Sequence, residues 1–248
     1  MRTLGQLLVS SRPLSWINTA FPFAAAYLLT TGRLDLAFWV GTLYFLIPYN
    51  LAMYGINDVF DYESDLRNPR KGGVEGALLD PSIHRTTLWA AVISNVPFLV
   101  VLVVLGSALS WLVLAVSVFA VVAYSAKGLR FKEKPVLDSI TSSTHFVSPA
   151  VYGLVLAGAS WTPALWLILI AFFLWGMASH AFGAVQDVIA DREGGLASIA
   201  TVLGARLTTR LSVAAYALAG VLVLGTDWPG PLAIAAALPY VAITAQFW

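Results

Sequence analysis

The chain has 248 residues, of which 59% are hydrophobic and only 11% are charged. A soluble domain has about 25% charged residues, so this composition excludes a water-soluble globule and indicates a protein of the bilayer. Because 14 basic residues balance 13 acidic ones, no basic excess is available for nucleic acid. The lack of cysteine excludes disulfides, thiolate metal sites and a cysteine nucleophile.

Apolar runs of about 17–25 residues predict transmembrane helices. Polar backbone cannot face lipid, so runs of this length indicate helices rather than barrel strands. We therefore predict an all-α fold class, a polytopic membrane helical bundle with about eight transmembrane helices in one domain, residues 1–248. In chain order the predicted helices are Leu14–Thr31, Leu36–Ile56, Leu88–Leu105, Leu109–Ala126, Val136–Ala157, Ala164–Val185, Leu211–Leu224 and Pro231–Trp248.

The basic residues predict the orientation of this bundle. Thirteen of the 14 cations fall in the N-terminal segment and in the loops after the second, fourth and sixth predicted helices, and only Arg33 falls on the other side. The positive-inside rule places the cation-rich side in the cytoplasm. We expect a multi-pass protein of the cytoplasmic membrane, with its N-terminus and acid-rich loops on the cytoplasmic side.

A first acidic motif lies at the cytoplasmic end of the second predicted helix. Residues four apart share a helix face, so Asn57, Asp61 and Asp65 form one stripe, with Asp58 beside it. A second motif, Asp187 and Asp191, lies at the same depth after the sixth predicted helix. Stacked carboxylates without sulfur or imidazole suit Mg²⁺ or Ca²⁺.

Mg²⁺ is typically held by one or two carboxylates together with substrate phosphates. Two such motifs facing each other could hold metal ions on either side of a diphosphate, and bound Mg²⁺ would make that diphosphate a better leaving group. Solvated acids at helix ends are the plainer interpretation for a single motif, but two spaced motifs on one side disfavour it. The cations expected to complete the anion site are Arg70, Lys71, Arg130, Lys132 and Arg192.

These motifs resemble those of the UbiA superfamily of intramembrane prenyltransferases. The family pattern is Asn/Asp-Asp-x-x-Asp-x-x-x-Asp after the second helix and Asp-x-x-x-Asp after the sixth. Further matches are Arg12-Pro13 at the first helix and Tyr124-Ser125 before Arg130. The resemblance covers residues 12 to about 225, and it implies Mg²⁺-dependent transfer of an isoprenoid from its diphosphate to an acceptor inside the bilayer.

The resemblance also implies roles for individual residues. Asn57, Asp61, Asp187 and Asp191 are the expected metal ligands. Asp58, Asp65 and Tyr124 are the expected catalytic residues, the two acids supporting the metal site and Tyr124 close to the diphosphate or the breaking bond. The residues expected to bind the diphosphate are Arg70, Lys71, Ser125, Arg130, Lys132 and Arg192.

Within the superfamily, residues 57–71 and 182–192 most resemble lycopene elongases. The expected partners are therefore dimethylallyl diphosphate, a lycopene-like lipid acceptor and membrane lipids, with C45 and C50 carotenoids as products and no nucleic acid. Quinone, chlorophyll or ether-lipid prenyltransferases are alternatives within the superfamily. A cation transporter is the alternative from another class, but transporters usually bind ions near the bilayer midplane rather than at helix ends.

Three polar residues inside apolar runs and the end of the chain complete the predictions. Asp138 is expected either to pair with Lys132 or Lys134 or to take part in catalysis. His145 is expected either to hydrogen-bond to a neighbouring helix or, as the sharper hypothesis, to accept a proton from the carbocation. His180 is expected to pack or to line the cavity. Because superfamily members usually have nine helices, the end of the chain inside the eighth apolar run indicates a truncated chain with reduced activity.

Overall fold

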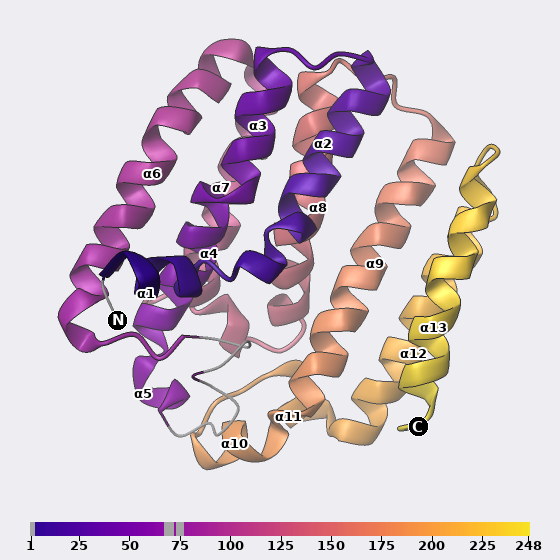
Figure 1. Cartoon of the computed structure of the whole chain (residues 1–248). Helices are drawn as coiled ribbons and strands as arrows, with labels where there is room; N and C mark the ends of the chain where they lie inside the picture. The colour runs from indigo at the N-terminus through magenta and orange to yellow at the C-terminus, as the bar shows by residue number, and fades with distance from the viewer. Residues whose placement is uncertain (1–2, 67–71, 73–76) are drawn as a thin grey trace. The chain divides into compact units, whose positions relative to one another are not determined.

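The computed structural model describes residues 3–66, 72 and 77–248, and the regular secondary structure of that part of the chain is helical (Figure 1). The predicted all-α fold class is confirmed. The chain divides into two compact units, Met1–Arg130 with Ser148–Ala159, and Phe131–Val147 with Ser160–Trp248. Each unit is described by itself below, and a single domain over residues 1–248 remains a prediction.

The first unit is a helical layer built around aromatic side chains. Phe23, Tyr44 and Phe45 are fully buried, and Gly41 lets the Phe23 ring lie directly against the backbone of the next helix. Among these helices, α2 packs on α3, and α4 packs on α1, α6 and α7. The α-helices that lie entirely in this unit are α1 (Thr3–Ser10), α2 (Ile17–Thr31), α3 (Leu36–Leu46), α4 (Pro48–Phe60), α5 (Tyr62–Asp65), α6 (His84–Leu105) and α7 (Ala108–Ser125).

The chain breaks between α3 and α4, and α4 then leads into the first acidic motif. Pro48 has no backbone N–H, so the chain leaves the helix at Ile47 and starts a new one. The Asn50 amide donates to the carbonyl oxygens of Phe45 at 2.8 Å and Leu46 at 3.0 Å, which satisfies carbonyls at the break. Such side-chain bonds are what make a broken helix tolerable at membrane depth.

The second unit carries the second acidic motif. Helix α9 (Pro163–Val185) packs against α12 (Ala205–Val223), which packs against α13 (Ile234–Ala245). Two short helices, α10 (Val188–Glu193) and α11 (Ile199–Leu203), connect α9 to α12. Helix α8 (Leu137–Leu156) begins in this unit and ends in the first.

Each of the eight predicted transmembrane runs coincides with a helix or, for residues 36–56, with the broken pair α3 and α4. Within the described part of the chain, five helical segments are long and apolar enough to cross a membrane: Leu36–Phe60, Pro81–Leu105, Ala108–Ser125, Pro163–Val185 and Ala205–Val223. Large apolar side chains such as Leu29 and Val104 are 87% and 78% exposed, as a lipid-facing surface requires. The membrane bundle is confirmed, and the count of eight spans remains a prediction.

Candidate active site

The first acidic motif keeps helical spacing across the join between α4 and α5. The amide of Asp61 donates to the Asn57 carbonyl at 2.9 Å, and the amide of Asp65 donates to the Asp61 carbonyl at 2.8 Å. Asn57, Asp61 and Asp65 therefore share one face, as their spacing predicts. Asp61 and Asp65 are each only 6% exposed, so these two carboxylates are buried in the fold and do not belong to a solvated loop.

Asp58 is held from α1 and the turn after it. Arg12 Nη2 donates to Asp58 Oδ1 at 3.0 Å, and Ser10 Oγ donates to Oδ2 at 2.9 Å. The Arg12 guanidinium also lies 4.2 Å from the centre of the Tyr54 ring. Arg12 has φ 51°, a left-handed conformation that is uncommon for a residue other than glycine. Asp58 thus joins the N-terminal segment to the acidic motif.

The end of α7 supplies polar partners to the same motif. Ser125, the last residue of α7, is fully buried, and its Oγ donates to Asn57 Oδ1 at 2.9 Å. Arg130 Nη2 lies 3.6 Å from Asp61 Oδ1. Tyr124 is partly exposed beside Ser125. Ser125 and Arg130, two of the residues expected to bind diphosphate, therefore contact expected metal ligands.

The second acidic motif lies where α9 ends and α10 begins. The amide of Asp191 donates to the Asp187 carbonyl at 2.8 Å, so the two acids again share a helix face. Ser198 Oγ donates to Asp191 Oδ2 at 3.2 Å. Burial raises the pKa of Asp191, and the nearby negative charge of Asp187 raises it further, whereas Ser198 and Lys132 oppose the shift. Asp187 and Asp191 therefore repel each other, as expected of ligands that share a cation.

The remaining expected diphosphate ligands occupy different surroundings. Lys132 is partly exposed and close enough to Asp191 to influence its charge. Arg192 is exposed, and its Nη2 donates to the Thr201 carbonyl at 3.2 Å. Arg70 and Lys71 lie outside the described residues.

The donor set of each motif fits a hard divalent cation. Asn57, Asp61 and Asp65 offer one amide and two carboxylate groups on one face, and Asp187 and Asp191 offer two carboxylates. In residues 3–66, 72 and 77–248, no group of three or more acidic or imidazole side chains could hold a metal ion by itself. Because Mg²⁺ needs only one or two carboxylates when phosphates complete its shell, this set fits Mg²⁺ bound together with a diphosphate.

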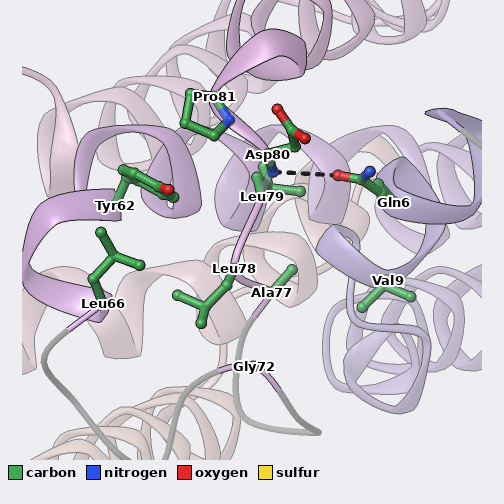
Figure 2. Close-up of a pocket in the computed structure, with 10 residues that line it drawn as sticks. All are labelled: Gln6, Val9, Tyr62, Leu66, Gly72, Ala77, Leu78, Leu79, Asp80 and Pro81. Atoms are coloured by element: carbon green, nitrogen blue, oxygen red, sulfur yellow. Dashed lines mark hydrogen bonds between the residues drawn. The ribbon is translucent and has the colours of Figure 1, made fainter. Parts of the chain in front are cut away.

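A separate hollow of about 510 Å³ lies beside the first motif (Figure 2). Tyr62 and Leu66 line one part of it, and Gln6 lies opposite, accepting a hydrogen bond from the Asp80 amide at 3.3 Å. Among the described residues that line this hollow, only Tyr62 belongs to the acidic segment 57–65. The hollow is therefore distinct from the stripe of expected metal ligands.

The helical membrane fold and the two aspartate motifs are the features expected of an intramembrane prenyltransferase. The profile of the UbiA prenyltransferase family matches residues 19–248. This chain therefore belongs to the UbiA prenyltransferase family.

Two relatives resemble the chain over nearly its whole length. A lycopene elongase/hydratase of Corynebacterium glutamicum is 59% identical over 248 residues, which is 100% of this chain and 86% of the relative. The C(50) beta-cyclic carotenoids biosynthesis protein LbtBC of a Dietzia species is 60% identical over 245 residues, which is 98% of this chain and 57% of that protein.

Solved structures show the same fold. A UbiA homologue from Archaeoglobus fulgidus bound to dimethylallyl diphosphate and Mg²⁺ superposes with a TM-score of 0.79, covering 98% of this chain and 88% of that chain. The two sequences are 21% identical. A homologue from Aeropyrum pernix superposes with a TM-score of 0.64 at 22% identity.

Arg12 and Asp138 have partners that the sequence did not predict. Arg12 was noted only as part of the Arg-Pro pair, whereas its guanidinium binds Asp58. Asp138 is fully buried, and its carboxylate accepts hydrogen bonds from the amides of Ile199 and Ser139 at 2.7 Å and 2.6 Å. An acid inside an apolar run is the available sequence signal, because such a group must find partners inside the protein.

Proposed function

We propose that this prenyltransferase moves a dimethylallyl group from dimethylallyl diphosphate to lycopene within the bilayer and so forms C45 and C50 carotenoids. The observation that carries the proposal is 59% identity to a lycopene elongase/hydratase along the entire chain. The two aspartate motifs supply the matching chemistry, because buried oxygen ligands with adjacent cations suit a metal-bound diphosphate.

The chain's own residues have defined tasks in this reaction. Asn57, Asp61, Asp187 and Asp191 would hold Mg²⁺, which would draw charge from the diphosphate and make it a better leaving group. Arg130 stays beside Asp61 and offers further N–H donors to phosphate oxygens, because a guanidinium has five. Asp65 lies on the same helix face as Asn57 and Asp61. Tyr124, next to Ser125, would lie close to the diphosphate.

Asp58 has a different task from its neighbours. Its two carboxylate oxygens accept hydrogen bonds from Arg12 and Ser10. This arrangement fixes the end of α4 and so orients Asn57 and Asp61. We therefore assign Asp58 as a positioning residue rather than a group that touches the substrate.

Carotenoid analysis of a lycopene-producing bacterial host tests the proposed function. Cells expressing this chain are expected to accumulate carotenoids heavier than lycopene by one and two C5 units, measured by chromatography with mass spectrometry. Cells expressing Asp61→Asn serve as the matched control and should retain lycopene. Unchanged lycopene together with a prenylated quinone would overturn the lycopene assignment.

The proposed orientation places both acidic motifs on the cytoplasmic side. The sequence has no cysteine, so single cysteines can report sidedness without background. Lys127→Cys and Ser160→Cys change exposed residues. A membrane-impermeant thiol reagent applied to intact spheroplasts should label the second variant, and the first only after the membrane is opened. Labelling of Lys127→Cys in intact spheroplasts would reverse the orientation.

A further inference from the structure

Hydrogen bonds link the second acidic motif to a buried carboxylate on another helix of the same unit. The Ser198 hydroxyl donates to Asp191 Oδ2 at 3.2 Å. The next residue, Ile199, donates its amide to Asp138 Oδ2 at 2.7 Å. Asp138 is fully buried, and Ser198 is only 6% exposed. An expected metal ligand is therefore connected to the start of α8 through the start of α11.

The hydroxyl of Ser198 has a defined direction. Its oxygen accepts a hydrogen bond from the Thr201 amide at 3.3 Å, and the Thr201 hydroxyl accepts one from the Ser198 amide at 2.8 Å. This reciprocal pair is a capping box, which fixes the first turn of α11. A serine hydroxyl has one proton, and because its oxygen accepts from Thr201, that proton is directed to Asp191. Ser198 therefore holds one oxygen of the expected metal ligand while it caps α11.

The chain folds back between α10 and α11 to bring these residues together. The Leu196 amide donates to the Asp191 carbonyl at 2.8 Å. Gly195 has φ 69°, a left-handed conformation that glycine adopts without steric cost. This turn ties α11 to α10, and Asp138 ties α11 to α8.

An aspartate suits position 138 because both of its oxygens receive donors. Oδ1 accepts from the Ser139 amide at 2.6 Å and from the Ser139 hydroxyl at 3.1 Å, and Oδ2 accepts from the Ile199 amide. An asparagine has one acceptor oxygen, so its NH₂ group would face a donor on one side. A carboxylate is costly to bury unless it is hydrogen-bonded, and these three bonds compensate it. The link between α8 and α11 therefore needs the carboxylate and not only a side chain of that size.

We propose that Asp138 and Ser198 are positioning residues for the metal ligand Asp191 and so set the affinity of the site for Mg²⁺. This inference rests on the proposed function, in which Asp191 binds the ion. Hydrogen-bond partners of a metal ligand orient it before the ion arrives, and loss of one such partner typically lowers metal affinity about 10–100-fold. Ser198 contacts the ligand directly, whereas Asp138 acts by holding Ile199 and with it the start of α11.

The Mg²⁺ dependence of thermal stability tests the inference without turnover. The full chain in detergent is titrated with Mg²⁺ in the presence of inorganic diphosphate, and unfolding is followed by tryptophan fluorescence. A bound ion raises the unfolding temperature, so the Mg²⁺ concentration that gives half of the maximal rise measures affinity. In Asp138→Asn and Ser198→Gly we expect this concentration to increase about tenfold or more. Glycine is tolerated at a helix N-cap, so Ser198→Gly removes the donor with little loss of helix stability.

Prenyl transfer to lycopene gives an independent measure. In both variants the Mg²⁺ concentration for half-maximal velocity should increase by the same factor, and the velocity should recover at saturating Mg²⁺. Ser198→Thr keeps the hydroxyl and should restore the wild-type affinity. Ser143→Ala removes another buried α8 hydroxyl, which donates to the Phe173 carbonyl on α9 at 2.7 Å. This control should lower the unfolding temperature and leave both Mg²⁺ concentrations unchanged.

Unchanged Mg²⁺ concentrations in Asp138→Asn and Ser198→Gly would overturn the inference and leave both residues with a structural role only. An equal loss of affinity in Ser143→Ala would also overturn it, because any lost contact of α8 would then weaken the site. If Asp138→Asn does not fold, the pair Ser198→Gly and Ser198→Thr still decides the role of the hydroxyl. A wild-type chain that does not respond to Mg²⁺ and diphosphate, or an Asp191→Asn variant that responds as the wild type does, would instead refute the metal site of the proposed function.

Discussion

The two aspartate motifs use the same four-residue spacing but differ in how the fold balances their charges. In the first unit, Arg12 binds Asp58 at 3.0 Å, and Arg130 lies 3.6 Å from Asp61. In the second unit, burial raises the pKa of Asp191, and the negative charge of Asp187 raises it further. In the first motif, cations of the chain lie against the carboxylates, whereas at Asp191 burial and the charge of Asp187 outweigh the opposing effects of Ser198 and Lys132. Both motifs suit Mg²⁺. Removal of one carboxylate charge, however, should destabilise the metal-free fold in the first motif and stabilise it in the second.

The largest expected effect is common to both motifs. Asp61→Asn and Asp187→Asn each remove one charged ligand with almost no change of volume. We expect each to lower prenyl transfer by about 10³-fold or more, equivalent to about 4 kcal/mol of transition-state stabilisation. The measurement is initial velocity with radiolabelled dimethylallyl diphosphate at saturating Mg²⁺. Near wild-type velocity in either variant would show that one motif suffices.

The next largest effect is a loss of stability that we expect in the first motif. Asp58→Ala leaves the guanidinium of Arg12, whose side chain is only 17% exposed, without its carboxylate. Breaking a buried ion pair by removing one partner typically costs about 3–5 kcal/mol, and we expect a loss near 3 kcal/mol because Arg12 keeps some solvent and the Tyr54 ring. Thermal unfolding in detergent measures it.

The double variant Arg12→Met with Asp58→Ala is the control for that loss. It removes both charges, so it should recover part of the stability lost in Asp58→Ala. If the double variant is as unstable as the sum of the two single variants, the two charges do not stabilise each other.

The long helices and the helical spacing of the first acidic motif could be predicted from local sequence, because a protein in the bilayer shows its helices as long apolar runs. Apolar runs must form helices in lipid, and the long helices fall where the runs predict them: α2, α3, α4, α6, α7, α8, α9, α12 and α13. The four-residue spacing of Asn57, Asp61 and Asp65 likewise required only helix geometry. Helix α1 was missed because its eight residues are too short to span a membrane.

The partners of the acids could not be predicted, because they depend on tertiary structure. Arg12 and Asp58 are 46 residues apart, and Ile199 and Asp138 are 61 apart. The sequence offered Lys132 and Lys134 as partners of Asp138 because they are near in the chain, whereas the carboxylate accepts from the Ile199 and Ser139 amides. Nothing in local periodicity indicates that a carboxylate will cap a helix on another element.

The smallest expected effect tests the comparison of the two motifs most directly, because here removal of a carboxylate charge is expected to stabilise the fold. The folded pKa of Asp191 lies above its unfolded value of 3.8. A carboxyl with a raised pKa favours the fold while it is protonated, and that contribution is lost as the pH rises through the folded pKa. At pH 7 and without divalent cations, ionised Asp191 therefore destabilises the fold. Asp191→Asn removes this charge and keeps an oxygen that can accept from Ser198.

We therefore expect Asp191→Asn to stabilise the metal-free protein at pH 7, by at most about 1 kcal/mol because solvent screens this half-buried pair. The gain should shrink as the pH falls and vanish below about pH 4, where the wild-type carboxyl is also protonated. Adding Mg²⁺ should reverse the order, because the wild-type protein binds it more tightly and is stabilised by that binding. Asp61→Asn removes the negative charge 3.6 Å from Arg130 Nη2, so this variant should be less stable than the wild type with or without the metal. Unfolding temperatures of the three proteins across pH and Mg²⁺ concentration measure these differences. Destabilisation by Asp191→Asn in the absence of metal would mean that cations of the chain stabilise the carboxylates of the second motif as they do those of the first.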